Sequence, residues 1–394
     1  MIVESYYWLS AVALLLVTLP GTLELALITF GALLPKRSRP AIPSAAYDVR
    51  LAVIIPAYNE ELGLPATLRS LLSCDDPPEP SDIVVVADNC TDRTADIARS
   101  LGCGVLERID PSRRGKGYGL NHAFRELENR GYAAYVIVDA DTVVDRKFLN
   151  EFRALFARGA AAGQCVYKVA NPEANIRTRL MNIAFLAFTF LRPLARHRLG
   201  LSAGIFGNGF GLCSRTLAEI PNDCFSLAED LEYHTKLVRA GKIVEFLPGT
   251  SVSAQMCTTA LGAKPQRERW EGGRFRIMAE QAPRLALDVF VRGRLRLLEP
   301  LLDLLLLPLA YHMVLLTLLL VMATDLLLVY ACVALLLVIV HVGQAMVLGG
   351  ADPSDWKALA AAPVYVIRKL LNLGGILKAA RKTTLWRRTQ RDNA

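Results

Sequence analysis

The amino-acid sequence predicts an α/β protein with a mainly parallel sheet, helices on both faces of that sheet and about three transmembrane helices. Short apolar runs alternate with segments of helical spacing between residues 51 and 250, and this order favours parallel strands joined by crossover helices. Hydrophobic residues make up 53% of the 394 residues, and the excess is concentrated in a few long runs. Such local runs are typical of membrane helices.

Residues 1–35 are expected to contain the first membrane helix. Residues 5–34 are almost wholly apolar, with Glu24 as their only charge, and they exceed the ~20 residues needed to cross the hydrocarbon core. They lack the features of a cleaved signal peptide. Glu24 is either a functional intramembrane acid or, as we favour, an acid packed at a helix interface. Basic residues follow at once and predict a cytoplasmic location for the next segment, namely Lys36, Arg37 and Arg39.

Residues 36–299 are expected to form a cytoplasmic α/β domain. Val- and Ile-rich runs predict buried strands, and apolar residues at helical spacing predict the helices between them. In sheets of this kind, ligands bind beyond the carboxyl ends of the strands. The expected strands are 51–55, 83–87, 104–108 and 134–138, and the expected helices are 62–73, 91–101, 117–129 and 231–240.

Three further segments are expected at the membrane. The short aromatic run 180–195 is flanked by arginines and predicts a helix in the membrane interface, although a buried core helix is the alternative. Residues 300–349 contain two apolar runs, 304–324 and 326–348, with a bend expected near Pro308. The tail 350–394 mixes basic and apolar residues and predicts an amphipathic segment on the inner leaflet. Its basic residues include Arg368, Lys369, Lys378, Arg381, Lys382, Arg387, Arg388 and Arg391.

The charge and cysteine content narrow the class of protein. The net charge of +8 suits an anionic partner, and the crowding of basic residues near the C-terminus favours membrane lipids over nucleic acid. The eight cysteines form no Cys-x-x-Cys pair and no spacing typical of zinc sites. Scattered cysteines of this kind fit a reducing compartment.

Carboxylates follow two of the expected strands. Asp139 and Asp141 stand two residues apart at a strand end, where a carboxylate pair can share a divalent metal that bridges diphosphate oxygens. A solvated turn is the alternative. Asp88 ends another apolar strand and is either a helix cap or a ligand contact.

Two other segments suit a nucleotide. Tyr58 and Glu60 directly follow the first expected strand, where an aromatic ring and a carboxylate can meet a base and its sugar. Lys116 lies in a basic, glycine-rich loop before a helix, and backbone N–H groups with a lysine can hold phosphate there. The loop lacks the spacing of a Walker motif, and a plain exposed loop is the alternative.

The segment Gly207-Asn208-Gly209 allows another molecule to approach the backbone closely, or forms a sharp turn. Glu229 and Asp230 open an expected helix, where acidic residues are favoured by the helix dipole. In the functional interpretation, Asp230 is a general base that accepts a proton from a hydroxyl group.

Gln266, Arg269 and Trp270 lie on one side of a helix if their segment is helical. The arginine can bind diphosphate in a forked geometry, and the indole offers a face for a sugar ring or lipid. A membrane-interface anchor is the alternative.

Taken in this order, the motifs resemble the membrane-bound family 2 inverting glycosyltransferases, the branch that includes cellulose, chitin and hyaluronan synthases. The resemblance covers residues 50–290 and implies a GT-A fold, a nucleotide-sugar donor that is usually UDP-linked, and Mg²⁺ or Mn²⁺. It implies Asp230 as the catalytic base and Asp141 as the metal ligand. The implied donor-binding residues are Tyr58, Glu60, Asp88, Lys116, Asp139, Gln266 and Arg269, and the expected acceptor-binding residues are Gly207, Asn208, Gly209, Glu229 and Trp270.

The chain departs from the large synthases in three respects. It has one N-terminal and two C-terminal expected spans, which is fewer than a polymer channel normally uses and argues against processive synthesis and secretion. It has Ala228-Glu-Asp where many relatives have Thr-Glu-Asp. It also has Gly207-Asn-Gly where synthases often have Gly-Thr or Gly-Ser.

We therefore expect a multi-pass inner-membrane enzyme whose cytoplasmic domain transfers sugar to a saccharide or a lipid-linked acceptor. Membrane lipids, a second copy of the chain and subunits of an export complex are the expected partners. Two alternatives stay open: an inactive scaffold subunit of a polysaccharide export complex, and a metal-dependent nucleotidyl- or phosphosugar transferase. The intact acidic residues count against the scaffold.

Overall fold

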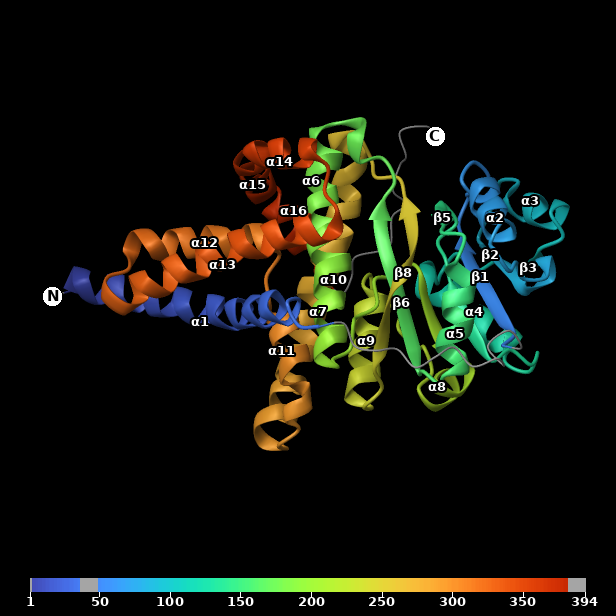
Figure 1. The fold of residues 1–394 in the computed structure, drawn as a ribbon, viewed down its shortest axis with the longest axis horizontal. Helices are drawn as coiled ribbons and strands as arrows, with labels where there is room; N and C mark the ends of the chain where they lie inside the picture. Colours follow the sequence, from blue (N-terminus) through green and yellow to red (C-terminus); the bar gives the residue numbers. More distant parts are fainter. Residues whose placement is uncertain (1, 36–48, 382–394) are drawn as a thin grey trace.

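The computed structural model describes residues 2–35 and 49–381, drawn as a ribbon in Figure 1. Several basic residues that predicted the membrane orientation lie outside the described residues, and the predictions that rest on them stay predictions. They are Lys36, Arg37, Arg39, Lys382, Arg387, Arg388 and Arg391.

The centre of the domain is an eight-stranded mixed sheet with the strand order β3-β2-β1-β4-β7-β6-β8-β5. The first four strands along the chain pair in parallel. Strand β7 is antiparallel to both β4 and β6, β6 is parallel to β8, and β5 is antiparallel to β8. The strands are β1 (Leu51–Ala57), β2 (Ile83–Asp88), β3 (Gly104–Arg108), β4 (Ala134–Ile137), β5 (Thr142–Val144), β6 (Ala162–Val169), β7 (Phe210–Cys213) and β8 (Val244–Ala254).

Helices cover both faces of this sheet, which confirms the predicted α/β class. Successive side chains of a strand point to opposite faces, and β1 divides its residues in this way: Val53 belongs to one hydrophobic core and Ile54 to the other. One core contains residues of α2 and α5, and the opposite core contains residues of α4 and α9. These helices are α2 (Leu64–Leu72), α4 (Lys116–Leu127), α5 (Phe148–Ala157) and α9 (Glu229–Arg239), with α3 (Thr94–Ser100) and α8 (Ser214–Glu219) beside them.

The predicted aromatic helix 180–195 lies inside a longer helical segment between the sheet and the apolar helices. It consists of α6 (Ile176–Phe185), a π-helical stretch (Leu186–Leu191) and α7 (Arg192–Leu199). The segment contacts β6 on one side and α1 and α13 on the other. Arg192 and Arg196 are buried, so this part of the segment packs as a core helix. Its depth in a membrane stays a prediction.

Helices α1 (Ile2–Gly31), α12 (Leu309–Met322) and α13 (Asp325–Gly349) lie side by side and project from the domain (Figure 1). Two helices, Tyr7–Gly31 and Asp325–Gly349, are long and apolar enough to cross a membrane, and the number rises to four if each bent pair forms one span. The expected span 304–324 corresponds mainly to α12, the second helix of one of these bent pairs, and the chain turns by 83° between Leu305 and Leu309. Pro308 stands at this break, as the sequence suggested.

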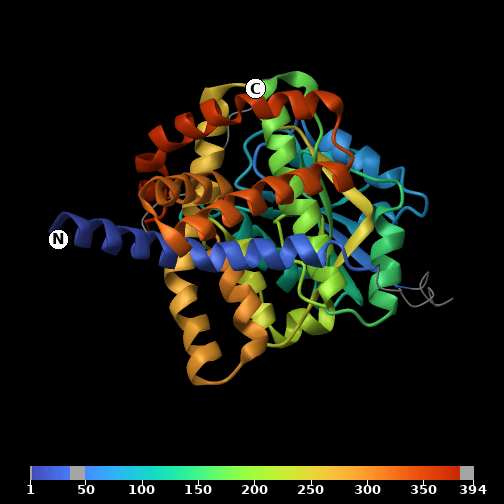
Figure 2. The same cartoon turned by 60° about the vertical axis from the view of Figure 1, so that its left-hand side comes forward.

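The remaining helices connect the domain with the apolar bundle. Figure 2 shows the C-terminal helices, in red, running across the green α6 segment above α1. Helix α16 packs on α10, where Gly272 leaves no room for a Cβ because it would lie 2.7 Å from Ala379. Lys369, expected on the membrane-facing surface of the tail, is instead 8% exposed and pairs with Glu271 of α10. These helices are α10 (Ala260–Ala286), α11 (Leu298–Leu305), α14 (Pro353–Ala358), α15 (Ala362–Leu371) and α16 (Leu373–Ala379).

Candidate active site

A cavity of about 950 Å³ opens beyond the carboxyl ends of β1, β2 and β4. All but two of the candidate site residues that the sequence singled out line this cavity, although they come from seven separate segments of the chain. The exceptions, Asn208 and Gly209, lie behind its wall. The lining residues of this set are Tyr58, Glu60, Asp88, Lys116, Asp139, Asp141, Gly207, Glu229, Asp230, Gln266, Arg269 and Trp270.

Asp88 marks one end of the cavity, at the last residue of β2. Its carboxylate accepts hydrogen bonds from Arg108 Nη1 at 2.6 Å and from Asn89 Nδ2 at 2.8 Å. Burial raises the pKa of Asp88, and the bonds to Arg108 oppose that rise. The backbone N–H of Thr94, the first residue of α3, donates to the carboxylate of Asp92 and not to that of Asp88. Asp88 is therefore not a cap of this helix, and its contact with a ligand stays a prediction.

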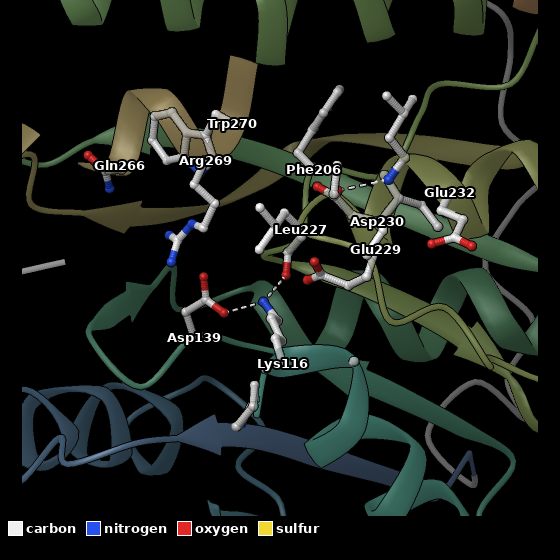
Figure 3. Close-up of a pocket in the computed structure, with 18 of the residues that line it drawn as sticks. Lys116, Asp139, Phe206, Leu227, Glu229, Asp230, Glu232, Gln266, Arg269 and Trp270 are labelled. Atoms are coloured by element: carbon white, nitrogen blue, oxygen red, sulfur yellow. Dashed lines mark hydrogen bonds and ion pairs between the residues drawn. The ribbon is translucent and has the colours of Figure 1, made fainter. Parts of the chain in front are cut away.

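Lys116 opens α4 directly after Gly115, which has a φ of 135°. Its ammonium group donates to the carboxylate of Asp139 and to the carbonyl oxygen of Gly207 (Figure 3). Burial opposes its charge, but Asp139 and Glu229 outweigh burial, and the pKa of Lys116 is raised. The lysine is therefore a fixed positive charge at the middle of the cavity.

Asn208 holds the loop that carries the Asp-x-Asp pair. Its side-chain oxygen accepts the backbone N–H of Asp139 at 3.1 Å, and its side-chain nitrogen donates to Thr142 Oγ1 at 2.9 Å. The side chain is fully buried. Asn208 therefore positions the loop and does not make the contact with an acceptor that the sequence led us to expect. Gly209 adopts a φ of 65°, and a Cβ there would lie 2.4 Å from the sulfur of Cys165. This position is a turn of the kind given as the alternative.

Asp230 lies in the first turn of α9 and accepts the backbone N–H of Leu231 at 2.8 Å. Gly207 approaches it so closely that a Cβ at Gly207 would lie 3.2 Å from the carboxylate. Burial raises the pKa of Asp230, and Lys116 lowers it to a smaller extent. Burial and the neighbouring Asp230 also raise the pKa of Glu229, whose side chain points toward Lys116 in Figure 3.

Arg269 and Trp270 come from α10 on the opposite wall of the cavity. The guanidinium of Arg269 extends toward Asp139 (Figure 3), and the ammonium group of Lys116 pairs with that carboxylate. Trp270 is 36% exposed and lies beside Phe185, with 6.3 Å between the ring centroids. The wall thus offers one cationic and one aromatic surface at adjacent positions.

The carboxylates fit a metal ion that also binds a ligand. No group of three or more His, Cys, Asp or Glu side chains within residues 2–35 and 49–381 is arranged to hold a metal. Asp139 and Asp141 both line the cavity and offer only oxygen ligands. Because Mg²⁺ commonly takes one or two carboxylates and completes its coordination with phosphate oxygens and water, this pair suits a metal that arrives with a diphosphate.

The sequence interpretation missed one end of the cavity. Beyond Asp230 the lining includes arginines and aromatic side chains that it had assigned to the membrane interface or had not singled out. Arg192 was visible only as a charge beside an apolar run, and no spacing linked it to Asp303. This end is lined by Tyr167, Phe185, Phe188, Arg192, Arg196, Phe206, Arg274 and Asp303.

A mixed α/β sheet with helices on both faces and carboxylates beyond its strand ends is the GT-A type of glycosyltransferase fold. Residues 49–273 match the family described as "Glycosyltransferase like family 2". That match covers more than half of the chain, and the chain belongs to this family.

Two curated relatives are similar in sequence to part of this chain. It is 27% identical over 239 residues to the probable glycosyltransferase YdaM of Bacillus subtilis (strain 168), across 57% of this chain and 55% of that protein. It is 37% identical over 98 residues to the 4,4'-diaponeurosporenoate glycosyltransferase of Staphylococcus aureus (strain USA300), across 25% of each chain. The matched part thus spans about half of the first relative and a quarter of the second.

The fold resembles that of the mannosyltransferase PcManGT from Pyrobaculum calidifontis, whose structure contains GDP-Man and Mn²⁺. The TM-score is 0.56 at 18% sequence identity, and the likeness covers 95% of this chain and 97% of that one. At this identity the comparison concerns the fold alone. It includes the region of the apolar helices, because nearly the whole of both chains is covered.

Proposed function

We propose that this chain is an inverting glycosyltransferase that transfers a sugar from a nucleotide-sugar donor, UDP-linked in our proposal, to a saccharide or lipid-linked acceptor at the inner membrane. The observation that carries the proposal is the convergence of Asp141, Asp230 and Arg269 on one cavity. These residues are far apart in the sequence and supply a metal ligand, a base and a diphosphate-binding cation. Membership of the family supports the transfer of a glycosyl group.

The donor would occupy the end of the cavity near the first two strands. Tyr58, Glu60 and Asp88 line that end and would contact the nucleoside. Lys116 and Arg269 would bind the diphosphate, since both are cations that line the cavity beside Asp139. A divalent cation on Asp141, with Asp139 beside the donor, would neutralise charge that develops on the leaving diphosphate.

Asp230 would act as the general base. Its carboxylate would take the proton of an acceptor hydroxyl while the hydroxyl oxygen forms a bond to the anomeric carbon of the donor sugar. The bond between that carbon and the diphosphate oxygen breaks in the same step, and the nucleoside diphosphate leaves with the electron pair. A single displacement of this kind inverts the anomeric configuration. The raised pKa of Asp230 makes it a stronger base than an ordinary aspartate.

The acceptor would enter from the side of the apolar helices. Trp270 and Phe185 form an aromatic wall there, and aromatic faces suit the apolar faces of sugar rings. The cavity ends at residues of α7 and α11, which contact α1. This arrangement supports a membrane-bound acceptor. A cytoplasmic location of the catalytic domain is part of the same proposal and rests on the basic residues of the sequence. Pairing of the chain with a second copy or with export subunits belongs to the same proposal.

A panel of nucleotide-sugars radiolabelled in the sugar, incubated with membranes that contain the chain, tests the proposal. We expect label from one or a few donors to enter a saccharide or lipid product that carries no donor phosphate. Parallel reactions with label in the β-phosphate should leave that label on the nucleoside diphosphate. Transfer of the β-phosphate label together with the sugar would instead establish a phosphosugar transferase. Absence of incorporation from every donor would favour the inactive scaffold.

A further inference from the structure

We propose that the end of the cavity near the apolar helices is a binding site for a phosphate group carried by a lipid-linked acceptor. The inference rests on the proposed function, because it concerns the acceptor of that reaction. It is carried by a buried cluster of six charged side chains, which we call the arginine cluster. Its members are Glu24, Arg192, Arg196, Arg274, Glu299 and Asp303.

The arginine cluster joins four helices at the base of the apolar bundle. Arg196 of α7 contacts Glu24 of α1 at 2.7 Å and Glu299 of α11 at 2.6 Å. Asp303 is shared by all three arginines: it pairs with Arg192, lies 2.9 Å from Arg196 and lies 3.7 Å from Arg274 of α10. One carboxylate therefore serves three guanidinium groups, and the other two carboxylates both serve Arg196.

The members that face the cavity are mainly cationic. Arg192, Arg196, Arg274 and Asp303 line the cavity, whereas Glu24 and Glu299 do not. Arg192 is 6% exposed. A guanidinium presents its donors in a fork that matches an oxyanion. Three cationic side chains and one carboxylate of the cluster line this wall, and this excess of positive charge therefore suits a phosphate.

The electrostatic environment of Arg192 agrees with this geometry. Burial first, and then the charges of Arg196 and Arg274, hold the pKa of Arg192 well below its ordinary value. Burial and the charges of Arg196 and Arg192 also lower the pKa of His234. Both effects indicate a region of positive potential, which an added anion would offset.

A continuous row of contacts links this site to the proposed catalytic base. Gly207 lies against Asp230, and the ring of the preceding residue, Phe206, contacts that of Phe188 in a tilted arrangement with 5.2 Å between ring centroids. The guanidinium of Arg192 lies 4.8 Å from the centroid of Phe188. Two aromatic rings thus separate the base from the arginine.

An extended ligand suits this row. A sugar of the acceptor would lie along the phenyl rings with its reacting hydroxyl at Asp230, and its phosphate would reach Arg192. The lipid chain would then continue toward the helices that carry the rest of the arginine cluster, since α1 contacts both α7 and α11.

The test measures how added ligands change the melting temperature of the purified full chain in a neutral, phosphate-free detergent, because a ligand that binds the folded state raises it. Three probes are compared: dodecyl phosphate, dodecanol and inorganic phosphate. The chain is studied as wild type, as Arg192→Gln and as Arg198→Gln. Arg198 is the matched control, because it also lies on α7 and contacts α1, through the carbonyl oxygen of Ala32, but does not line the cavity.

We expect dodecyl phosphate to raise the melting temperature of the wild type and of Arg198→Gln in a saturable manner, and dodecanol to have no such effect. Arg192→Gln should require at least about tenfold more dodecyl phosphate for the same rise in melting temperature, because the variant loses a hydrogen bond to a charged group. If Arg192→Gln does not fold, Arg274→Gln takes its place with the same expected direction, because Arg274 lines the same wall.

Equal stabilisation by dodecanol and dodecyl phosphate would overturn the proposal. A variant, Arg192→Gln or Arg274→Gln in its place, that responds to dodecyl phosphate as the wild type does would also overturn it. Stabilisation by inorganic phosphate as strong as that by dodecyl phosphate would overturn the lipid as the source of the phosphate. No nucleotide-sugar is present in this experiment. Its failure is therefore distinct from failure of the proposed transferase reaction, which the donor panel tests separately.

Discussion

Lys116 and Asp139 form an ion pair across the centre of the cavity, between the first residue of α4 and the loop that follows β4. The same ammonium group also donates to the carbonyl oxygen of Gly207, which lies against Asp230. Lys116 thus connects the proposed donor side of the cavity with the proposed base. Its positive charge acts on the carboxylates of both sides.

The charge of Lys116 should set the pH dependence of the reaction. Burial raises the pKa of Asp230, and Lys116 lowers it. Replacing Lys116 with Met removes the lowering contribution, so the pKa of Asp230 rises further. Because the base works only when deprotonated, the acid limb of the kcat/KM profile should move to higher pH. The profile is measured with saturating donor, and Lys147→Met on the exposed start of α5 is the control. An acid limb that stays in place or moves to lower pH contradicts the assignment.

Removal of the base should separate catalysis from binding. Asp230→Asn keeps the shape of the side chain but cannot accept the proton, and turnover should fall by about 10²–10⁴-fold. Binding of the nucleoside diphosphate, measured by calorimetry, should change little. Asp96→Asn is the matched control, because Asp96 lies on the exposed surface of α3. Near-normal turnover of Asp230→Asn would remove Asp230 from the role of base.

The diphosphate assignment of Arg269 predicts a selective loss of affinity. Arg269→Ala should weaken binding of the nucleoside diphosphate about tenfold to a hundredfold, the range for hydrogen bonds to charged groups. Affinity for the nucleoside without phosphate should stay the same. Arg284→Ala provides the comparison, since Arg284 lies exposed on the last turn of the same helix. An equal loss of affinity for both ligands would mean that Arg269 does not contact phosphate.

The close approach of α4 to a neighbouring loop predicts a specific loss of stability. A Cβ at Gly117 would lie 2.1 Å from the carbonyl oxygen of Cys224, which is a backbone atom and cannot move aside. Gly117→Ala should therefore lower the free energy of unfolding by about 1–3 kcal/mol, the usual cost of overpacking. Gly374→Ala is the control, because its Cβ would have no atom within 4 Å. Thermal unfolding of the two variants gives the comparison, and equal melting temperatures would contradict the predicted clash.

The half of the sheet at the proposed donor site could be predicted because most of its strands are continuous apolar runs with short crossovers. The predicted strand 104–108 matches β3 residue for residue, and β1, β2 and β4 begin at the predicted positions. The other half of the sheet could not be predicted, because its strands pair with strands that are distant in the sequence. Strand β5 has only three residues, and β7 follows a glycine-rich turn that carries no strand pattern of its own.

The candidate site could likewise be predicted only in part. Carboxylates at strand ends were predictable, since the ends of parallel strands meet at one edge of the sheet. The positioning role of Asn208 was not, because it depends on a hydrogen bond to the backbone of Asp139 that no local spacing reveals. The pairing of Arg192 with Asp303 likewise arises only when α7 and α11 pack together.

The central claim is that one cavity joins a metal-dependent donor site at Asp141 to a base at Asp230. Release of nucleoside diphosphate by the purified chain, with a nucleotide-sugar and acceptor-containing lipid extract, tests it most directly. We predict release that requires Mg²⁺ or Mn²⁺ and that falls to background in both Asp141→Asn and Asp230→Asn. Release that continues without a divalent cation, or at full rate in either variant, would contradict the claim.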